Sequence, residues 1–514
     1  MTDHYRRSEV FQCIIATGMR TLLLAVFSAA LSLADVRLPA LLADHMVVQR
    51  GMPVHVWGHA SPGEAVTVAF RGASASAVAD DIGAWSLYLP PAQPGGPFEM
   101  EVRGANTIRL TDVLVGDVWV ASGQSNMEFA VKDSVGGEAE VAAANHPRIR
   151  LLHVQNSVAD HPLDDVVVKH PWRPCSPEAV SDFSAVAYYF GRDLYQRDST
   201  PIGLIESSWG GTPAESWTSL RALSADAALM PVFAEWSKMA DALIAVKARR
   251  ERQLARWQEA VAKAKQEGRT PPSRPWQAND SGEWAPASLF NAMIAPLTPF
   301  AIKGVIWYQG EGNATNERAD LYHRLFGTMI QDWRRAWGIG DFPFLFVQLA
   351  NFKTAASARW PEIREAQRKT LSLANTAMAV TIDIGDPVDI HPKNKQGVGQ
   401  RLALAARSFA GSASEASGPL FRQAVPEAGS MRVWFDHTGS GLKAKAGVVT
   451  GFEVAGADRV FVPAEASIEG RTVVVSSPSV KAPSFVRYGW KDNPDATLYN
   501  GEGLPASPFR SGCW

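Results

Sequence analysis

Short segments of alternating hydrophobic and polar residues occupy the chain between residues 35 and 112. In one of them Val54 and Val56 alternate with His55 and Trp57, and Ser-Pro-Gly and Pro-Gly-Gly turns separate the segments. A period of two residues is typical of strands with one buried face, and short strands joined by such turns are typical of a β-sandwich. We therefore predict an N-terminal β-sandwich domain over residues 35–112.

Residues 113–410 carry a different pattern, in which apolar runs of strand length alternate with helical segments. This alternation is typical of an α/β fold with a parallel sheet flanked by helices, and such sheets bind ligands beyond the carboxyl ends of their strands. After residue 411 short strand-like segments return, which predicts a C-terminal β domain over residues 411–514. The apolar runs of the central region are VGDVWVAS, IGLIESSW, KGVIWYQG, FPFLFVQLA and AMAVTIDIG.

One segment of the central region departs from this pattern. Residues 234–268 include KARRERQLARWQEAVAKAKQEGR, which is rich in strong helix formers, and a loop-like stretch follows. We interpret the segment as part of a helical insertion at about residues 225–285. Two roles stay open for the helix: it flanks the functional site, or it is a solvated surface helix without a role in chemistry.

The N-terminus has the pattern of a secretory signal peptide. Met19-Arg20 precedes the short apolar run TLLLAVFSAALSLA, which ends in small residues and is too short to span a bilayer. We expect cleavage after Ala34, with residues 1–18 as an upstream extension of the signal peptide at 1–34, and a periplasmic or secreted protein. Cys13 lies before the expected cleavage site, which leaves Cys175 and Cys513 in the mature chain. These two cysteines can form one disulfide, but their presence alone does not establish it.

Composition narrows the classes of function. At 514 residues the chain is long enough for about three domains. The net charge of −2 gives no basic excess for nucleic-acid binding. The 17 tryptophans are a high count, and although most fill cores, aromatic rings also serve as platforms for sugar rings.

Ser125 follows the apolar run DVLVGDVWVA, in the sequence Gly-Gln-Ser-Asn-Met. Gly123 allows a sharp turn out of a strand, and a serine at such a turn presents its hydroxyl beyond the sheet at a helix N-terminus, as in a nucleophile elbow. Glu128, three residues on, also allows a structural interpretation, in which Ser125 belongs to a capping box. The choice depends on whether the chain supplies a base.

His391 is the histidine best placed to be that base. The sequence TIDIGDPVDIHPKNKQG begins as a strand and leaves it in a loop that presents His391, whereas the other histidines lie in the β domain, in polar stretches or within a helical pattern. Asp389, two positions earlier, is close enough to receive a ring N–H. Pro392 favours an extended conformation at His391, which limits where the ring points.

Two further strand ends complete a candidate site. In LIESSWGGTPAESW, Gly210 and Gly211 allow close approach of the backbone to a ligand beside Trp209. In VIWYQGEGNA, the Gln309 amide and backbone N–H groups can converge on the same edge of the sheet. Acyl transfer needs such donors for the oxyanion. The predicted substrate contacts around these strand ends are Gln124, Asn126, Trp209, Glu311 and Asn313.

Together these stretches resemble the sialate O-acetylesterase family of SGNH/GDSL-type hydrolases, which is related to carbohydrate esterase family 6. The resemblance covers nearly the whole mature chain. The stretches that carry it are LADHMVVQRG, GDVWVASGQSNME, FSAVAYYFGRDL, GLIESSWGGTPAESW, LFNAMIAPL, GVIWYQGEGNA, DIGDPVDIHPKNKQGVGQRLAL and VRYGWKDNP.

The resemblance implies an SGNH-hydrolase-like sheet, Ser125 as nucleophile and His391 as general base. It also implies an oxyanion hole made by the N–H of Ser125, an N–H of Gly210 or Gly211, and the side chain of Gln309. In many SGNH enzymes the acid lies three residues before the histidine, and Val388 occupies that position here. Asp389 is therefore the candidate for the third member. The alternatives are Asp386, Asp383 or a backbone carbonyl that leaves a Ser–His dyad.

The activity implied is hydrolysis of acetyl esters on carbohydrates through an acyl-enzyme, without a cofactor and without a metal site. The acetylated partner is open between 9-O-acetyl sialic acid and xylan or another plant polysaccharide. Arg359, Arg364 and Arg401 are candidates for a sialate-carboxylate clamp by position alone, with structural ion pairs as the alternative. A non-catalytic glycan-binding protein, or a lipase or peptidase with the same residues, are the competing classes.

Overall fold

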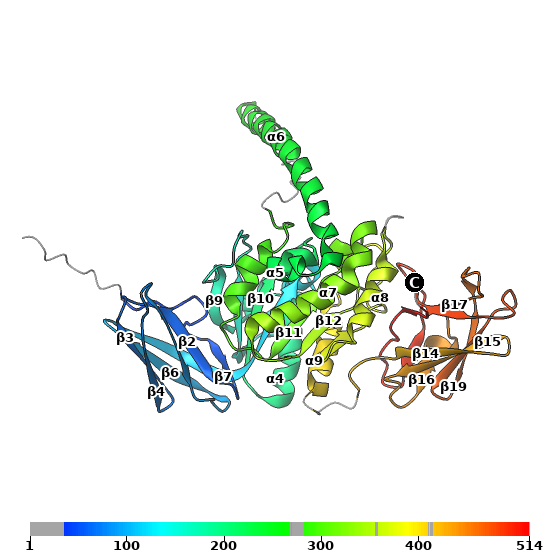
Figure 1. The fold of residues 1–514 in the computed structure, drawn as a ribbon, viewed down its shortest axis with the longest axis horizontal. Helices are drawn as coiled ribbons and strands as arrows, with labels where there is room; N and C mark the ends of the chain where they lie inside the picture. Colours follow the sequence, from blue (N-terminus) through cyan, green and yellow to red (C-terminus); the bar gives the residue numbers. More distant parts are fainter. Residues whose placement is uncertain are drawn as a thin grey trace, which may run out of the picture.

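The computed structural model describes residues 35–267, 269, 282–354, 358–409, 411 and 415–512. The signal peptide expected at 1–34, residues 270–281 of the expected insertion and Cys513 lie outside this description. Figure 1 shows a β domain at one end of the molecule, a helix-flanked sheet in the middle and a second β domain at the other end. The predicted fold class is confirmed. Cys175 is a buried free cysteine.

The N-terminal domain is built from short antiparallel strands whose burial alternates along the chain. Val54 and Val56 are buried while His55 and Trp57 are half-buried, which confirms the period of two residues. Strand β2 pairs with β5, and β3 pairs with β4 and β6. The strands are β1 (Val47–Gln49), β2 (Val54–His59), β3 (Ala65–Phe70), β4 (Ala73–Val78), β5 (Ala84–Leu89), β6 (Gly95–Arg103) and β7 (Thr107–Gly123).

Strand β7 belongs to two domains. Its first half pairs with β6 in the N-terminal domain, and its second half pairs in parallel with β10 and β11 in the central sheet. Asp112 lies between the halves with a φ of 54°, and its carboxylate accepts two hydrogen bonds from the buried Arg150 side chain. The boundary predicted after residue 112 therefore falls inside one continuous strand.

The central sheet has the strand order β13-β12-β11-β7-β10-β8-β9, and its neighbours are parallel except β8 and β9. Every residue of β10, β11 and β12 is buried, as expected for a sheet covered on both faces. The chain first extends the sheet on one side of β7 and then on the other, so β7 lies at the topological switch point. The remaining strands are β8 (His146–Val154), β9 (Val168–Cys175), β10 (Ile202–Ser208), β11 (Gly304–Tyr308), β12 (Phe344–Val347) and β13 (Thr376–Ala379).

Helices cover the central sheet. Helix α4 packs against α9 and β10, and α7 packs against α8. The helix expected at 234–268 corresponds to α6, which ends at Gln266 and projects from the central domain (Figure 1), and residue 268 lies outside the described residues. Within the described residues, no helix combines the length and the apolar character needed to cross a membrane. The α-helices are α1 (Ser125–Glu128), α2 (Gly137–Ala143), α3 (Pro177–Ser181), α4 (Ala185–Asp198), α5 (Leu220–Ser224), α6 (Pro231–Gln266), α7 (Asn316–Trp337), α8 (Trp360–Thr370) and α9 (Lys395–Phe409).

The C-terminal domain has a hydrophobic core of its own, and Phe452, Tyr488 and Phe509 lie at its centre. Its larger sheets have the orders β14-β15-β20-β19 and β18-β17-β21-β23, and β16 pairs with β22. The strands are β14 (Leu420–Glu427), β15 (Ser430–Asp436), β16 (Leu442–Ala444), β17 (Phe452–Ala455), β18 (Val462–Pro463), β19 (Glu465–Glu469), β20 (Thr472–Ser476), β21 (Phe485–Tyr488), β22 (Leu498–Asn500) and β23 (Phe509–Arg510).

Candidate active site

Ser125 is the first residue of helix α1, directly beyond the carboxyl end of β7. The turn needs glycine at position 123, where φ is 139° and a Cβ atom would lie 2.1 Å from the Tyr308 carbonyl oxygen of β11. Gln124 is the N-cap and makes no side-chain capping bond. The Glu128 carboxylate accepts from the Gly210 N–H at 2.7 Å instead of from the start of α1. The capping-box interpretation is therefore wrong, and Ser125 sits at the switch point of the sheet.

His391 lies opposite Ser125, although 266 positions separate them in the chain. Its Nε2 atom is 2.8 Å from Ser125 Oγ, which is hydrogen-bond distance. Burial lowers the pKa of His391, the positive charge of Lys395 lowers it further, and the Asp389 carboxylate raises it. The imidazole is therefore neutral near pH 7, so Nε2 can accept the hydroxyl proton of Ser125.

Asp389 is the nearest of the three acidic candidates, but it does not hydrogen-bond the His391 ring. Its Oδ1 lies 3.8 Å from Nδ1 and accepts the backbone N–H of His391 at 2.9 Å. Asp386 accepts from the backbone N–H groups of Val388 and Asp389. Asp383 forms a two-pronged ion pair with the Arg401 guanidinium. Asp386 and Asp383 thus have structural partners, and only Asp389 acts on the ring, through its charge.

Some of the expected oxyanion donors are hydrogen-bonded within the protein, and others have no acceptor in the ranges that the structure describes. Gly210 contacts Ser125, since a Cβ at Gly210 would lie 3.3 Å from Ser125 Cβ, but its N–H is bonded to Glu128. Gln309 is fully buried, and its amide donates to Asn313 Oδ1 at 2.6 Å and to a backbone carbonyl at 3.3 Å. The oxyanion roles of Gly210 and Gln309 stay predictions, since both donors are bonded within the protein in this structure. The N–H groups of Ser125 and Gly211 have no acceptor among the described residues.

Most of the predicted substrate contacts connect the strand-end loops to one another. The Gln124 side chain accepts from the N–H of Gly312 at 3.0 Å. Asn313 donates to Glu215 at 2.8 Å and accepts from the Ala214 N–H at 2.9 Å. Gln124 and Asn313 are almost completely buried. Their substrate contacts stay predictions, and the bonds of the Gln124 amide oxygen and of the Asn313 amide connect the loops of the site.

Asn126 donates to Glu311 and to the Ile390 carbonyl oxygen of the histidine loop, whereas Trp209 is half-buried beside Gly210. Asn126 is 1% exposed, and a substrate contact at this residue stays a prediction. The residue that sequence reasoning missed is Lys395, which donates from Nζ to Asn126 Oδ1 and is fully buried. A lysine at a helix start usually predicts an exposed side chain. Its place four residues after His391 was the only available signal.

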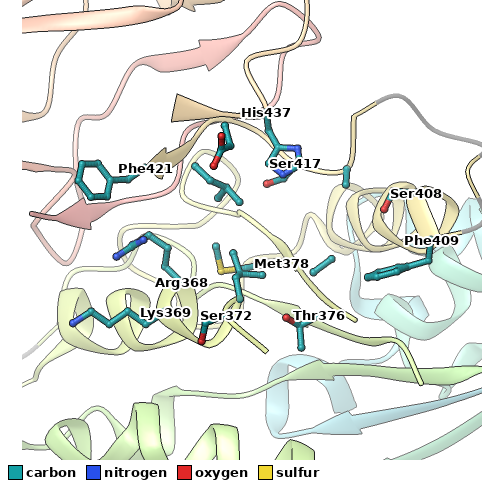
Figure 2. A pocket seen from close by; sticks show the side chains of 15 residues that line it. Arg368, Lys369, Ser372, Thr376, Met378, Ser408, Phe409, Ser417, Phe421 and His437 are labelled. Atoms are coloured by element: carbon teal, nitrogen blue, oxygen red, sulfur yellow. The ribbon is translucent and has the colours of Figure 1, made fainter. Parts of the chain in front are cut away.

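A large pocket elsewhere does not include the serine or the histidine. It has a volume of about 600 Å³, and Figure 2 shows Arg368, Lys369, Met378, Phe421 and His437 among the side chains around it. The pocket is lined by the first residues of β13, which is part of the parallel sheet, so it lies at the edge opposite Ser125. In the described part of the chain, no group of three or more His, Cys, Asp or Glu side chains is arranged to hold a metal ion.

Comparisons with known proteins agree on one family. The family model described as carbohydrate esterase, sialic acid-specific acetylesterase matches residues 273–408, which include His391. The sialate O-acetylesterase of Mus musculus is 34% identical over 417 residues, 73% of each chain, and that of Homo sapiens is 33% identical over 392 residues, 69% of this chain and 67% of its own. A solved carbohydrate acetylesterase from Xanthomonas citri is 40% identical, with a TM-score of 0.80, and the match covers 93% of this chain and 100% of that one.

Proposed function

This chain belongs to the sialate O-acetylesterase family of carbohydrate esterases, and we propose that it hydrolyses acetyl esters on carbohydrates with Ser125 and His391. The observation that carries the proposal is the 2.8 Å distance between Ser125 Oγ and His391 Nε2 at the carboxyl edge of the sheet. A hydroxyl becomes a nucleophile when a neutral imidazole accepts its proton, and the lowered pKa of His391 favours the neutral form.

The reaction proceeds through an acyl-enzyme. Ser125 Oγ attacks the acetyl carbonyl carbon while His391 Nε2 takes the hydroxyl proton. The negative charge on the carbonyl oxygen is stabilised by the N–H groups of Ser125 and Gly211. The bond to the sugar oxygen then breaks, and His391 gives the proton to that oxygen. Water attacks the acetyl-serine with His391 again as base, which releases acetate and restores Ser125.

The substrate is an acetylated sugar, and the three candidate arginines indicate whether that sugar carries a carboxylate. Arg364 donates to four backbone carbonyls, and Arg401 is paired with Asp383. Arg359 lies within ion-pair distance of Asp320 and Glu362. These guanidinium groups are therefore engaged by the protein instead of being held ready for a sialate carboxylate. This favours, as the second candidate, an acetylesterase for neutral sugars such as acetylated xylan or another plant polysaccharide.

We also propose that the protein is exported to the periplasm or secreted. The basis is the sequence of residues 19–34, a positive start followed by a short apolar run and small residues. N-terminal sequencing of the protein from its native cells should begin at Asp35. A chain that retains residues 1–34 and stays in the cytoplasm would contradict the proposal.

The catalytic proposal is tested with 4-nitrophenyl acetate and the substitutions Ser125→Ala and His391→Ala. Each should lower kcat/KM by about a thousandfold or more, as expected when a nucleophile or its base is lost. The exposed His161→Ala is the matched control and should keep full activity. Full activity of Ser125→Ala would refute the site. Acetylated xylan beside 9-O-acetyl sialic acid, tested as substrates of the unmodified enzyme, would then separate the two substrate classes.

A further inference from the structure

Three segments that form the candidate site meet at the side chain of Asn126. This residue follows Ser125 on α1, and its Nδ2 donates to the carbonyl oxygen of Ile390 at 3.0 Å, directly before His391. The same nitrogen donates at 2.6 Å to Glu311 Oε1, in the turn that follows β11. One amide group therefore connects the nucleophile's helix, the histidine loop and the neighbouring strand end.

Lys395 completes this cluster from α9. Its Nζ donates to Asn126 Oδ1, and it lies 4.7 Å from the ring centre of Phe129 and 5.4 Å from that of Tyr308. Lys395 is fully buried, and burying an ammonium group is costly unless other groups compensate it. An amide oxygen, two aromatic faces and the charges of Glu311 and Asp389 offset part of this cost. Burial still lowers the pKa of Lys395 to about 7, so the ammonium group is charged on the acidic side of neutral pH.

We propose that Asn126, Glu311 and Lys395 act as one positioning unit, which holds the helix of Ser125 against the loop of His391 and places a positive charge near the imidazole. The inference rests on the proposed function of Ser125 and His391. It gives Asn126 and Glu311 a different role from substrate binding. Asn126 is adjacent to Ser125 in the chain, and it bonds Ile390, which is adjacent to His391. The distance between the Ser125 hydroxyl and the His391 imidazole therefore depends on the two bonds that Asn126 donates.

The charge has a measurable consequence for the base. Among the described residues, the charged groups that act on the His391 ring are Lys395 from α9 and Asp389 from its own loop. A nearby cation disfavours the protonated imidazole, so Lys395 lowers the pKa of His391 and keeps the base neutral at lower pH. Removing this cation should therefore raise the pKa of His391. The acidic limb of the activity profile would then move to higher pH.

The first experiment measures kcat/KM against pH for Lys395→Met. Methionine keeps an unbranched apolar stem and removes the charge. We expect the acidic limb to move up by about 0.5 pH unit or more, with a lower plateau. The exposed Lys393→Met, two positions away, is the matched control and should leave the profile unchanged. An unshifted acidic limb in folded Lys395→Met would overturn the inference.

The second experiment uses Asn126→Ala and decides the question where Lys395→Met does not fold. A positioning role predicts a fall in kcat of about tenfold to a hundredfold with little change in KM, because the reacting groups lose alignment. A rise in KM at unchanged kcat would instead indicate a substrate contact and overturn the inference. Ser125→Ala separates a failure of the proposed function from a failure of the positioning unit. If Ser125→Ala abolishes activity while Lys395→Met and Asn126→Ala behave like the unmodified enzyme, only the positioning unit is refuted.

Discussion

Replacing Asp389 with asparagine separates the two contributions of this residue to the histidine loop. In the structure Oδ1 accepts the backbone N–H of His391 at 2.9 Å and lies 3.8 Å from the ring Nδ1. Asparagine keeps an oxygen for the backbone bond and removes the negative charge that acts on the ring. Asp389→Ala removes both. The difference between the two variants therefore measures the loop contact, and Asp389→Asn measures the charge.

The expected size of the charge effect follows from distance and exposure. Two unit charges at this separation interact with about 1 kcal/mol in bulk water and about 4 kcal/mol at an effective dielectric constant of about 20. The Asp389 side chain is 45% exposed, which favours the lower value, and exposed pairs typically contribute about 0.2–1 kcal/mol. One kcal/mol corresponds to about fivefold in rate. We therefore expect Asp389→Asn to lower kcat/KM by about fivefold or less.

The assay is the pH dependence of kcat/KM with 4-nitrophenyl acetate. Because the Asp389 carboxylate raises the pKa of His391, its loss should lower that pKa and move the acidic limb to lower pH. A buried aspartate that hydrogen-bonds the histidine ring contributes about 10⁴-fold in a Ser-His-Asp triad. A loss of that size in Asp389→Asn would refute the reasoning. It would mean that the carboxylate bonds the ring directly during the reaction.

Two further predictions concern stability. Arg364→Met removes a buried cation that donates to four backbone carbonyls, two of them at residues 491 and 492 of the C-terminal domain. This substitution should lower the free energy of unfolding by about 3–5 kcal/mol in urea titrations. The half-buried Arg359→Met is the comparison, with about 1 kcal/mol or less expected, and equal losses would contradict the account. Burial raises the pKa of Glu206 to about 8, whereas the pKa in the unfolded chain is about 4.3. At pH values between these two pKa values, unfolding releases a proton from Glu206, so the contribution of this carboxyl group to stability falls as pH rises. Glu206→Gln binds no proton, and its stability relative to the unmodified protein should therefore improve from about pH 5 to about pH 8; a constant difference would exclude a buried, protonated Glu206.

The sequence contained enough information to predict the fold and the meeting of two residues at one edge of the sheet. Continuous apolar runs identify strands buried on both faces, and the carboxyl ends of parallel strands share one edge. Ser125 and His391 each follow such a run, so their proximity depends on backbone topology alone. The long helix α6 was equally predictable, because its composition favours a helix without help from packing.

The partners of the polar side chains were not predictable in the same way. Gln309 can donate to a substrate oxygen or to Asn313, and the sequence is identical in both cases. The choice depends on which groups the fold buries beside it, since a buried donor must find an acceptor. Lys395 was missed for the same reason. Its side chain points into the protein, toward Asn126, only because α9 begins at that position.

Strand β7 makes the N-terminal domain unsuitable as an exchangeable module. The ladder that carries Ser125 to its position continues into that domain, and β1 pairs with β7 from Leu114 to Gly116. Recombination between relatives at residue 112 would join two halves of a strand with different twist and neighbours. Crossovers meant to preserve the nucleophile should therefore be placed upstream of Val47, so that both sides of the ladder are inherited together.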